Sequence, residues 1–177
     1  MDNSFILVLV AGILANNYAI QNFLGIDTIL GNGSSVKKSV RLGGFAALVM
    51  VVSAVINWPL QTYVLKNMEY LQTLVFVTVI LIITGLLQKA MQKSLDKGSF
   101  AVAINGAVLG LCIQNAEVGF GEAVFTAIGA GLGFVAAMAV FASLRERVED
   151  DFVPASFRGL PVSLLIAAMM SLVLFAF

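Results

Sequence analysis

The sequence predicts an all-α integral membrane protein with six transmembrane helices, and three observations lead to this prediction. Apolar residues make up 60% of the 177 residues and charged residues only 11%, with a mean hydropathy of +0.99. A water-soluble domain carries roughly a quarter of charged residues, so this chain could not cover a surface that faces water. Six apolar segments follow one another along the chain, and basic residues gather in alternate connections between them.

A membrane-spanning helix needs roughly 20 apolar residues, and the six segments are read on this basis. The predicted helices cover about 5–30, 40–64, 70–87, a segment that begins near Phe100, 123–144 and 160–177. The second helix carries Trp58 and Tyr63 near its end, which is typical of the membrane interface. The fifth contains Gly129, Gly131 and Gly133, and small residues of this kind let another helix backbone approach closely.

The basic residues predict the orientation. Nine of the ten Lys and Arg residues fall in the first, third and fifth connections, and only Lys66 falls in an even-numbered one. The nine are Lys37, Lys38, Arg41, Lys89, Lys93, Lys97, Arg145, Arg147 and Arg158. Because basic connections stay in the cytoplasm, we expect a multi-pass protein with both termini outside.

The chain is expected to form a single membrane domain, 1–177, that contains two repeats. Three helices in each half place repeat one at about 1–90 and repeat two at about 98–177, so the second half enters the membrane from the opposite side. This arrangement predicts two inverted three-helix repeats.

Both repeats begin with a helix that is unusually polar. Its polar and small residues are Asn16, Asn17 and Gly25 in the first helix, and Asn105 and Gly110 in the fourth. Matched interruptions of this kind predict that both helices are broken near mid-membrane and meet there, at the functional centre. The alternative is that these Asn side chains only form hydrogen bonds between helices.

Composition excludes several kinds of chemistry. The formal net charge is zero and the chain has no His, so neither a basic surface for nucleic acid nor a histidine metal site or acid–base pair is expected. Cys112 is the only cysteine, which rules out a disulfide within the chain. No nucleotide-binding or hydrolase motif occurs, so we expect no catalysis by the chain alone.

Three stretches of the chain resemble the RnfA/NqrE family of small six-helix membrane subunits. The first, NNYAIQNFLGID at 16–27, is similar to the family pattern E-N-x-x-x-x-x-F-L-G-x-C. The second, NGAVLG at 105–110, is similar to N-C-A-x-x-G. The third, at 144–172, resembles the last cytoplasmic connection and last helix of the family, and the predicted orientation matches the A-type member.

The resemblance implies a subunit of an ion-translocating NADH, ferredoxin or quinone oxidoreductase. In this family a sister membrane subunit of opposite orientation packs beside the chain, and the two subunits share one [2Fe-2S] cluster held by four cysteines. Flavins and further iron–sulfur centres are expected on partner subunits. Electron transfer through the complex is coupled to movement of Na⁺ or H⁺.

Both cysteine positions of the family are replaced in this sequence, by Asp27 and Gly106. Asp27 is either a hard oxygen ligand for a metal ion such as Na⁺ or a cap for a helix fragment beside Gly25. Gly106 has no donor atom and is expected to allow close backbone approach or the helix break. Cys112 lies six residues further on, which is about 240° away in direction on a regular helix. It is therefore a weak candidate for a ligand, and a small buried apolar residue is the alternative.

Three functions remain open at this point. The chain could carry or scaffold electron transfer in an Rnf-like complex. It could instead be a paralogue without a cluster that acts as an ion channel or carrier, or a structural subunit that stabilises its sister. The changed cysteine positions favour the last two, and the family pattern elsewhere favours the first.

Overall fold

The computed structural model describes residues 24–32, 35–66, 68–90, 103–148 and 153–175. These residues form six α-helices and two short 3-10 helices, and none of them lies in a strand. The α-helices are α2 (Ile26–Asn32), α3 (Val36–Tyr63), α4 (Gln72–Ala90), α6 (Gly106–Gln114), α7 (Phe120–Arg147) and α8 (Leu160–Phe175). The 3-10 helices are η1 (Glu69–Leu71) and η3 (Ala155–Phe157).

Three helices in the described part, α3, α4 and α7, are long and apolar enough to cross a membrane. They correspond to the predicted second, third and fifth helices, and their ends differ from those predictions by up to four residues. The predicted sixth helix is α8, whose apolar part, Leu160–Val173, is shorter. Within the predicted first helix the structure describes α2, and within the predicted fourth helix it describes α6. The inverted repeat and the two breaks stay predictions, because 1–23 and 91–102 lie outside those residues.

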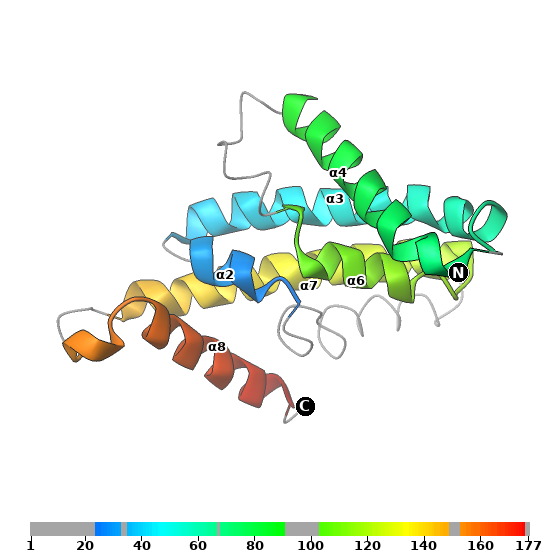
Figure 1. The fold of residues 1–177 in the computed structure, drawn as a ribbon. Helices are drawn as coiled ribbons and strands as arrows, with labels where there is room; N and C mark the ends of the chain where they lie inside the picture. The colour runs from blue at the N-terminus through cyan, green and yellow to red at the C-terminus, as the bar shows by residue number, and fades with distance from the viewer. Residues whose placement is uncertain (1–23, 33–34, 67, 91–102, 149–152, 176–177) are drawn as a thin grey trace.

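The centre of the fold is the pair α3 and α7, which run side by side in opposite directions (Figure 1). Small residues set how closely they approach. A Cβ atom at Gly131 of α7 would lie 3.0 Å from the Cβ and 3.2 Å from the Cα of Ala47 on α3. At Gly43 of α3, a Cβ would lie 3.3 Å from the Cα of Val135. The sequence predicted that glycines of the fifth helix, which is α7, allow close packing, and this is confirmed at Gly131.

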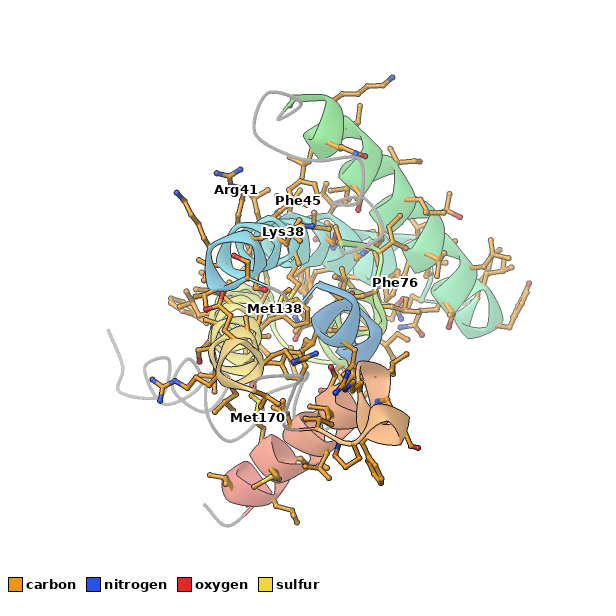
Figure 2. All side chains as sticks on the ribbon, turned by 90° about the vertical axis from the view of Figure 1, so that its left-hand side faces the viewer. Lys38, Arg41, Phe45, Phe76, Met138 and Met170 are labelled. Carbon is orange, nitrogen blue, oxygen red and sulfur yellow. The ribbon has the colours of Figure 1, made fainter. Side chains whose placement is uncertain are left out.

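The remaining helices pack around this pair. The short helix α6 and the oblique helix α4 cover α3, while α2 and α8 pack against α7 (Figure 1). Phe45, Phe76 and Met138 fill the interior between them and are almost fully buried (Figure 2). By contrast, α4 and α8 expose large apolar side chains, as expected of surfaces that face lipid or neighbouring subunits.

Basic side chains gather at one end of the α3–α7 pair. Lys38 and Arg41 project from the first turns of α3 (Figure 2), and Arg145 lies in the last turn of α7. The two helix ends are joined directly, since the backbone N–H of Val36 donates to Oε1 of Glu146 at 2.9 Å. The first and fifth connections therefore lie on the same side, as the sequence predicts.

Candidate functional site

The start of α2 is set by Gly25. This residue is buried and has a φ of 79°, a conformation that glycine adopts without steric cost. Its carbonyl accepts from the backbone N–H groups of Thr28 and Ile29 at 3.1 and 3.4 Å, which begins the helix. A Cβ at this position would lie 3.1 Å from a ring carbon of Phe134 and 3.2 Å from Cγ of Asn105.

The start of α6 is set by Asn105. Its backbone is extended, with φ −122° and ψ 166°, and its side chain turns back onto the helix. The Oδ1 atom accepts from the N–H groups of Ala107 at 2.9 Å and Val108 at 3.1 Å. Because Asn105 is only 7% exposed, this cap satisfies two N–H groups that water could not easily reach.

The two family-like motifs meet at these helix starts, which we call the α2–α6 junction (residues 24–26 and 105–110). A Cβ at Gly106 would lie 3.6 Å from Cδ2 of Leu24 and 3.8 Å from the backbone N of Gly25. At Gly110 it would lie 2.7 Å from Cδ1 of Leu24, so no side chain fits there without a shift. The structure thus brings together Gly25, Asn105, Gly106 and Gly110, four of the residues singled out in the sequence.

The other residues singled out in the sequence do not complete a ligand set. Asp27 lies in the first turn of α2, but its side chain is outside the described part of the structure, as are Asn16 and Asn17. Cys112 is 2% exposed, and its Sγ accepts from Nδ2 of Asn57 on α3 at 3.3 Å. Its thiol therefore faces α3, whereas Gly106 and Gly110 face Leu24.

A [2Fe-2S] cluster needs four thiolates or close substitutes, and the residues at this junction do not fit that requirement. Gly106 contributes no donor atom, and Cys112 is directed to another helix. Within the described ranges, no group of three His, Cys, Asp or Glu side chains is placed to hold a metal ion. The junction described here is a packing and capping site, and the ligand prediction for Asp27 stays a prediction.

Sequence reasoning missed a second polar region, which lies on α3. Ser53, Asn57 and Gln61 are spaced four residues apart and therefore share one helix face. Ser53 and Asn57 are at most 1% exposed. The signal was available, because polar residues at helical spacing inside an apolar span mark an interior face.

Side-chain hydrogen bonds also fix the connection between α6 and α7. Nε1 of Trp58 donates to the carbonyl of Val118 at 2.8 Å, and its ring packs edge-on against Phe120. Nδ2 of Asn115 donates to the carbonyl of Ala123 at 3.0 Å. The sequence placed Trp58 in an interfacial belt, and its bond to Val118 could not be foreseen from that position.

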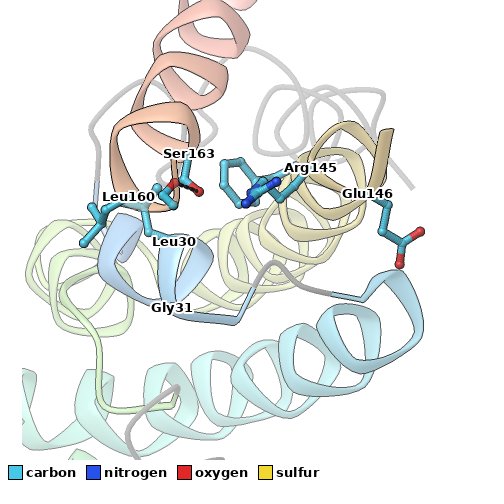
Figure 3. Close-up of a pocket in the computed structure, with 8 residues that line it drawn as sticks. Leu30, Gly31, Arg145, Glu146, Leu160 and Ser163 are labelled. Carbon is cyan, nitrogen blue, oxygen red and sulfur yellow. Dashed lines mark hydrogen bonds between the residues drawn. The ribbon is translucent and has the colours of Figure 1, made fainter. Parts of the chain in front are cut away.

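A pocket of about 430 Å³ opens at the basic end of the bundle (Figure 3). Its lining comes from α2, α7 and α8 and the turn before α8, and consists of Leu30, Gly31, Phe141, Arg145, Glu146, Gly159, Leu160 and Ser163. The charged groups here have partners within the chain, since Nη1 of Arg145 donates to the carbonyl of Val148 and Glu146 accepts from Val36.

Comparison with known proteins gives a consistent result. The family model described as "Rnf-Nqr subunit, membrane protein" matches residues 5–177. The A-type subunit of the ion-translocating oxidoreductase complex of Syntrophotalea carbinolica is 34% identical, over 98% of this chain and 96% of that protein. The A-type subunit of the Na(+)-translocating ferredoxin:NAD(+) oxidoreductase complex of Acetobacterium woodii is 32% identical over the same shares. The corresponding subunit of the Pseudomonas aeruginosa ion-translocating complex is 34% identical over 97% and 94%.

Proposed function

This chain belongs to the Rnf-Nqr family of membrane subunits, and we propose that it is the A-type membrane subunit of an Rnf-like ion-translocating oxidoreductase complex. The observation that carries the proposal is the match to A-type subunits over nearly the whole of both chains. The names of these relatives describe complexes that translocate ions, in one case Na⁺ with ferredoxin and NAD⁺ as redox partners. By itself the chain would catalyse no reaction.

We further propose that the chain scaffolds electron transfer without supplying thiolate ligands to a cluster. This rests on the donor set at the α2–α6 junction, where Gly106 has no side chain and Cys112 faces Asn57. A [2Fe-2S] cluster, when a related subunit pair holds one, supplies a one-electron carrier within the membrane. Flavins and other iron–sulfur centres would be carried by partner subunits.

The residues of this chain would then hold the junction and its surroundings in place. Gly25 and Asn105 fix the starts of α2 and α6, and Phe134 places this junction against the α3–α7 pair. A sister membrane subunit of opposite orientation would pack beside the chain, with lipid around both. The basic end would lie in the cytoplasm of a bacterial-type inner membrane, with both termini outside.

Asp27 is proposed as an oxygen ligand for the moving ion, since it stands at a family cysteine position and carboxylates suit hard cations. Its test is the Asp27→Asn substitution, which keeps size and removes the charge. We expect slower ion transport with an intact complex. Unchanged ion transport and electron transfer in this variant would leave Asp27 with the role of a helix-capping residue.

The main test is purification of the complex through a tag on this chain. We expect flavin-containing and iron–sulfur subunits to co-purify, and the preparation to catalyse electron transfer that drives Na⁺ or H⁺ movement in proteoliposomes. Recovery of the chain without any redox subunit would contradict the proposal. Iron content and the paramagnetic resonance spectrum of the same preparation test the second proposal, which a [2Fe-2S] signal assigned to this chain would overturn.

The replaced cysteine positions favour one alternative function. A paralogue without a cluster could act as an ion carrier or channel, or stabilise another membrane subunit. Ion flux through proteoliposomes that contain this chain but no redox subunit would support the carrier. Co-purification with redox-inactive membrane subunits and no flux would support the structural role.

A further inference from the structure

The pocket at the basic end of the bundle combines one positive charge with apolar walls. Arg145 in the last turn of α7 supplies the charge, and Leu30 of α2 and Leu160 of α8 supply apolar side chains. Phe141 lies four residues before Arg145, on the same face of α7 and one turn nearer to the middle of that helix. The charge therefore lies at the end of a span, and an apolar wall lies on the side of the membrane interior.

The two charged side chains of this pocket extend in different directions. Arg145 extends from α7 toward Ser163 of α8, whereas Glu146 extends toward the start of α3 (Figure 3). Oε1 of Glu146 accepts from the backbone N–H of Val36 at 2.9 Å, where the positive end of the α3 dipole stabilises a carboxylate. The negative charge is therefore held at α3, and Arg145 is the charged residue that extends between α7 and α8.

The chemistry of Arg145 allows it to hold its place and bind an anion at the same time. Its Nη1 donates to the carbonyl of Val148 at 3.3 Å, which ties the side chain to the end of α7. A guanidinium has several N–H donors in a planar fork, so one bond to a carbonyl is compatible with a further bond to a phosphate oxygen. Its positive charge does not depend on pH in the physiological range.

The pocket adjoins an exposed row of apolar residues on α8, which we call the α8 apolar row. Its members are spaced four residues apart and are all exposed: Leu160, Leu164, Ala168 and Leu172. Residues at this spacing share one face of a helix. Because Leu160 also lines the pocket, the row leads from the pocket along α8. A hydrocarbon chain that leaves the pocket can therefore continue against this helix.

The charges around the pocket favour a ligand with a net negative charge. Arg147 lies in the same last turn of α7 as Arg145, and Arg158 directly precedes Gly159, which lines the pocket. Anionic headgroups are attracted by such clusters at a membrane surface, and zwitterionic ones much less. The acidic residues at 149–151 of the sequence lie outside the described residues, so the test below compares the two kinds of lipid directly.

We propose that this pocket binds the phosphate group of an anionic phospholipid, with an acyl chain along the α8 apolar row. Arg145 pairs with the phosphate, and Leu30 and Phe141 contact the apolar part of the molecule. A soluble phosphate would use only the charge, whereas a phospholipid uses the charge, the apolar walls and the row. This inference goes beyond the proposed function, because it concerns a lipid site on this chain whichever redox subunits accompany it.

The test measures lipid binding to the detergent-purified chain with the subunits that it retains. Radiolabelled dioleoyl phosphatidylglycerol is bound to the immobilised protein, and its displacement by unlabelled competitors is followed by scintillation proximity. We expect saturable binding, with dioleoyl phosphatidylcholine at least about tenfold weaker as a competitor. Glycerol 3-phosphate, which has the phosphate but no acyl chain, should not compete over the same concentrations.

Arg145→Gln should raise the phosphatidylglycerol concentration at half-saturation about tenfold, because a hydrogen bond between charged groups is lost. Arg147→Gln is the matched control, since it removes the same charge from the same turn of α7 but not from the lining of the pocket. It should leave half-saturation nearly unchanged. The unfolding midpoint of each variant in phosphatidylcholine shows whether it folds, so weaker binding is read only from folded protein.

A second pair of variants changes the space in the pocket and leaves its charge intact. Gly31 lines the pocket, and a Cβ there has no neighbour within 4 Å, so Gly31→Leu adds bulk without a clash. It should weaken phosphatidylglycerol binding. Gly44→Leu is the control, because Gly44 is equally open but lies on α3 outside the pocket, and it should have no effect.

Four outcomes would overturn the proposal. Absence of saturable binding would mean that no lipid enters the pocket, and equal competition by phosphatidylcholine would mean that its charge is not read. Competition by glycerol 3-phosphate as strong as that by the lipid would assign the pocket to a soluble phosphate compound. Equal weakening by Arg145→Gln and Arg147→Gln would show a diffuse attraction to the basic end instead of a site.

Discussion

Glycine serves opposite purposes in two regions of this molecule. In the α3–α7 pair, Gly131 lies inside a regular helix and leaves out bulk, so that the backbone of α3 can come close. At the α2–α6 junction, Gly25 lies outside the helix and turns the chain with its positive φ. The first use tunes a long contact between two spans, and the second determines where a short helix begins.

The difference shows how each region resists change. The α3–α7 contact is distributed over many turns of two 28-residue helices, so a local disturbance can be shared among neighbours. The junction depends on a few atoms at two helix starts, where Gly25 supplies a positive φ and Asn105 supplies the cap. We therefore expect equal chemical changes to cost more at the junction than in the helix pair.

The largest effect is expected for Gly25→Ala. An L-residue at φ 79° is strained, and the new methyl group would meet Phe134, Asn105 and Ala107 at 3.1–3.3 Å. Together these effects should lower the free energy of unfolding by about 3 kcal/mol. The measurement is reversible unfolding in mixed detergent micelles, followed by circular dichroism.

The control for this change is Gly159→Ala. Gly159 has nearly the same φ, 81°, but a Cβ there has no neighbour within 4 Å. The free energy of unfolding of Gly159→Ala should fall only by the cost of the backbone conformation, about 1 kcal/mol. Equal losses for the two variants would mean that the junction contacts around Gly25 contribute nothing to stability.

The next effect, in the helix pair, is expected for Gly131→Ala. The added methyl group would lie 3.0 Å from Cβ and 3.2 Å from Cα of Ala47, so the two helices must separate slightly. We expect a loss of about 2 kcal/mol, which the same unfolding measurement detects. Gly44→Ala is the control, since a Cβ at Gly44 meets nothing, and it should be neutral or stabilise α3 by up to about 1 kcal/mol. A loss at Gly131 no larger than at Gly44 would refute close packing of these helices.

The sequence was sufficient for the long helices and for the residues of the junction. Length and hydropathy located α3, α4 and α7, because membrane spans are determined by composition over about 20 residues. The motifs around Gly25 and Asn105 identified two segments that the structure brings together. Both kinds of information are local in the chain, so they could be read without the fold.

Helical spacing could place Ser53, Asn57 and Gln61 on one face of α3, but neither their contacts nor the partner of Cys112 could be predicted in the same way. That Cys112 faces Asn57 depends on how far α6 is shifted along α3, and 55 residues separate the two in sequence. Likewise, nothing in the sequence distinguishes the buried hydroxyls of Ser53 and Thr84, which have no hydrogen-bond partner, from those of Thr62 and Thr78, which bond to the preceding turn. These properties arise from packing, which periodicity does not specify.

A smaller effect at the junction is expected for Asn105→Ala. This change removes the acceptor for the N–H groups of Ala107 and Val108, and the loss of a helix cap costs about 1 kcal/mol. Asn105→Ser keeps a side-chain acceptor at this position and should recover most of the loss in the same unfolding assay. If Asn105→Ser is no more stable than Asn105→Ala, the contribution of Asn105 to stability does not come from the capping bond.

The smallest effect is expected where α7 begins, for Trp58→Phe. The change removes the Nε1 bond to the carbonyl of Val118 but keeps a ring that can pack edge-on against Phe120. One such bond contributes about 0.5–1 kcal/mol, so a small drop in the thermal midpoint is expected. Trp58→Leu loses the ring as well, so its thermal midpoint should fall further. Equal stability of the Phe variant and the parent would show that Val118 finds another donor, and that the start of α7 adapts more readily than the junction does.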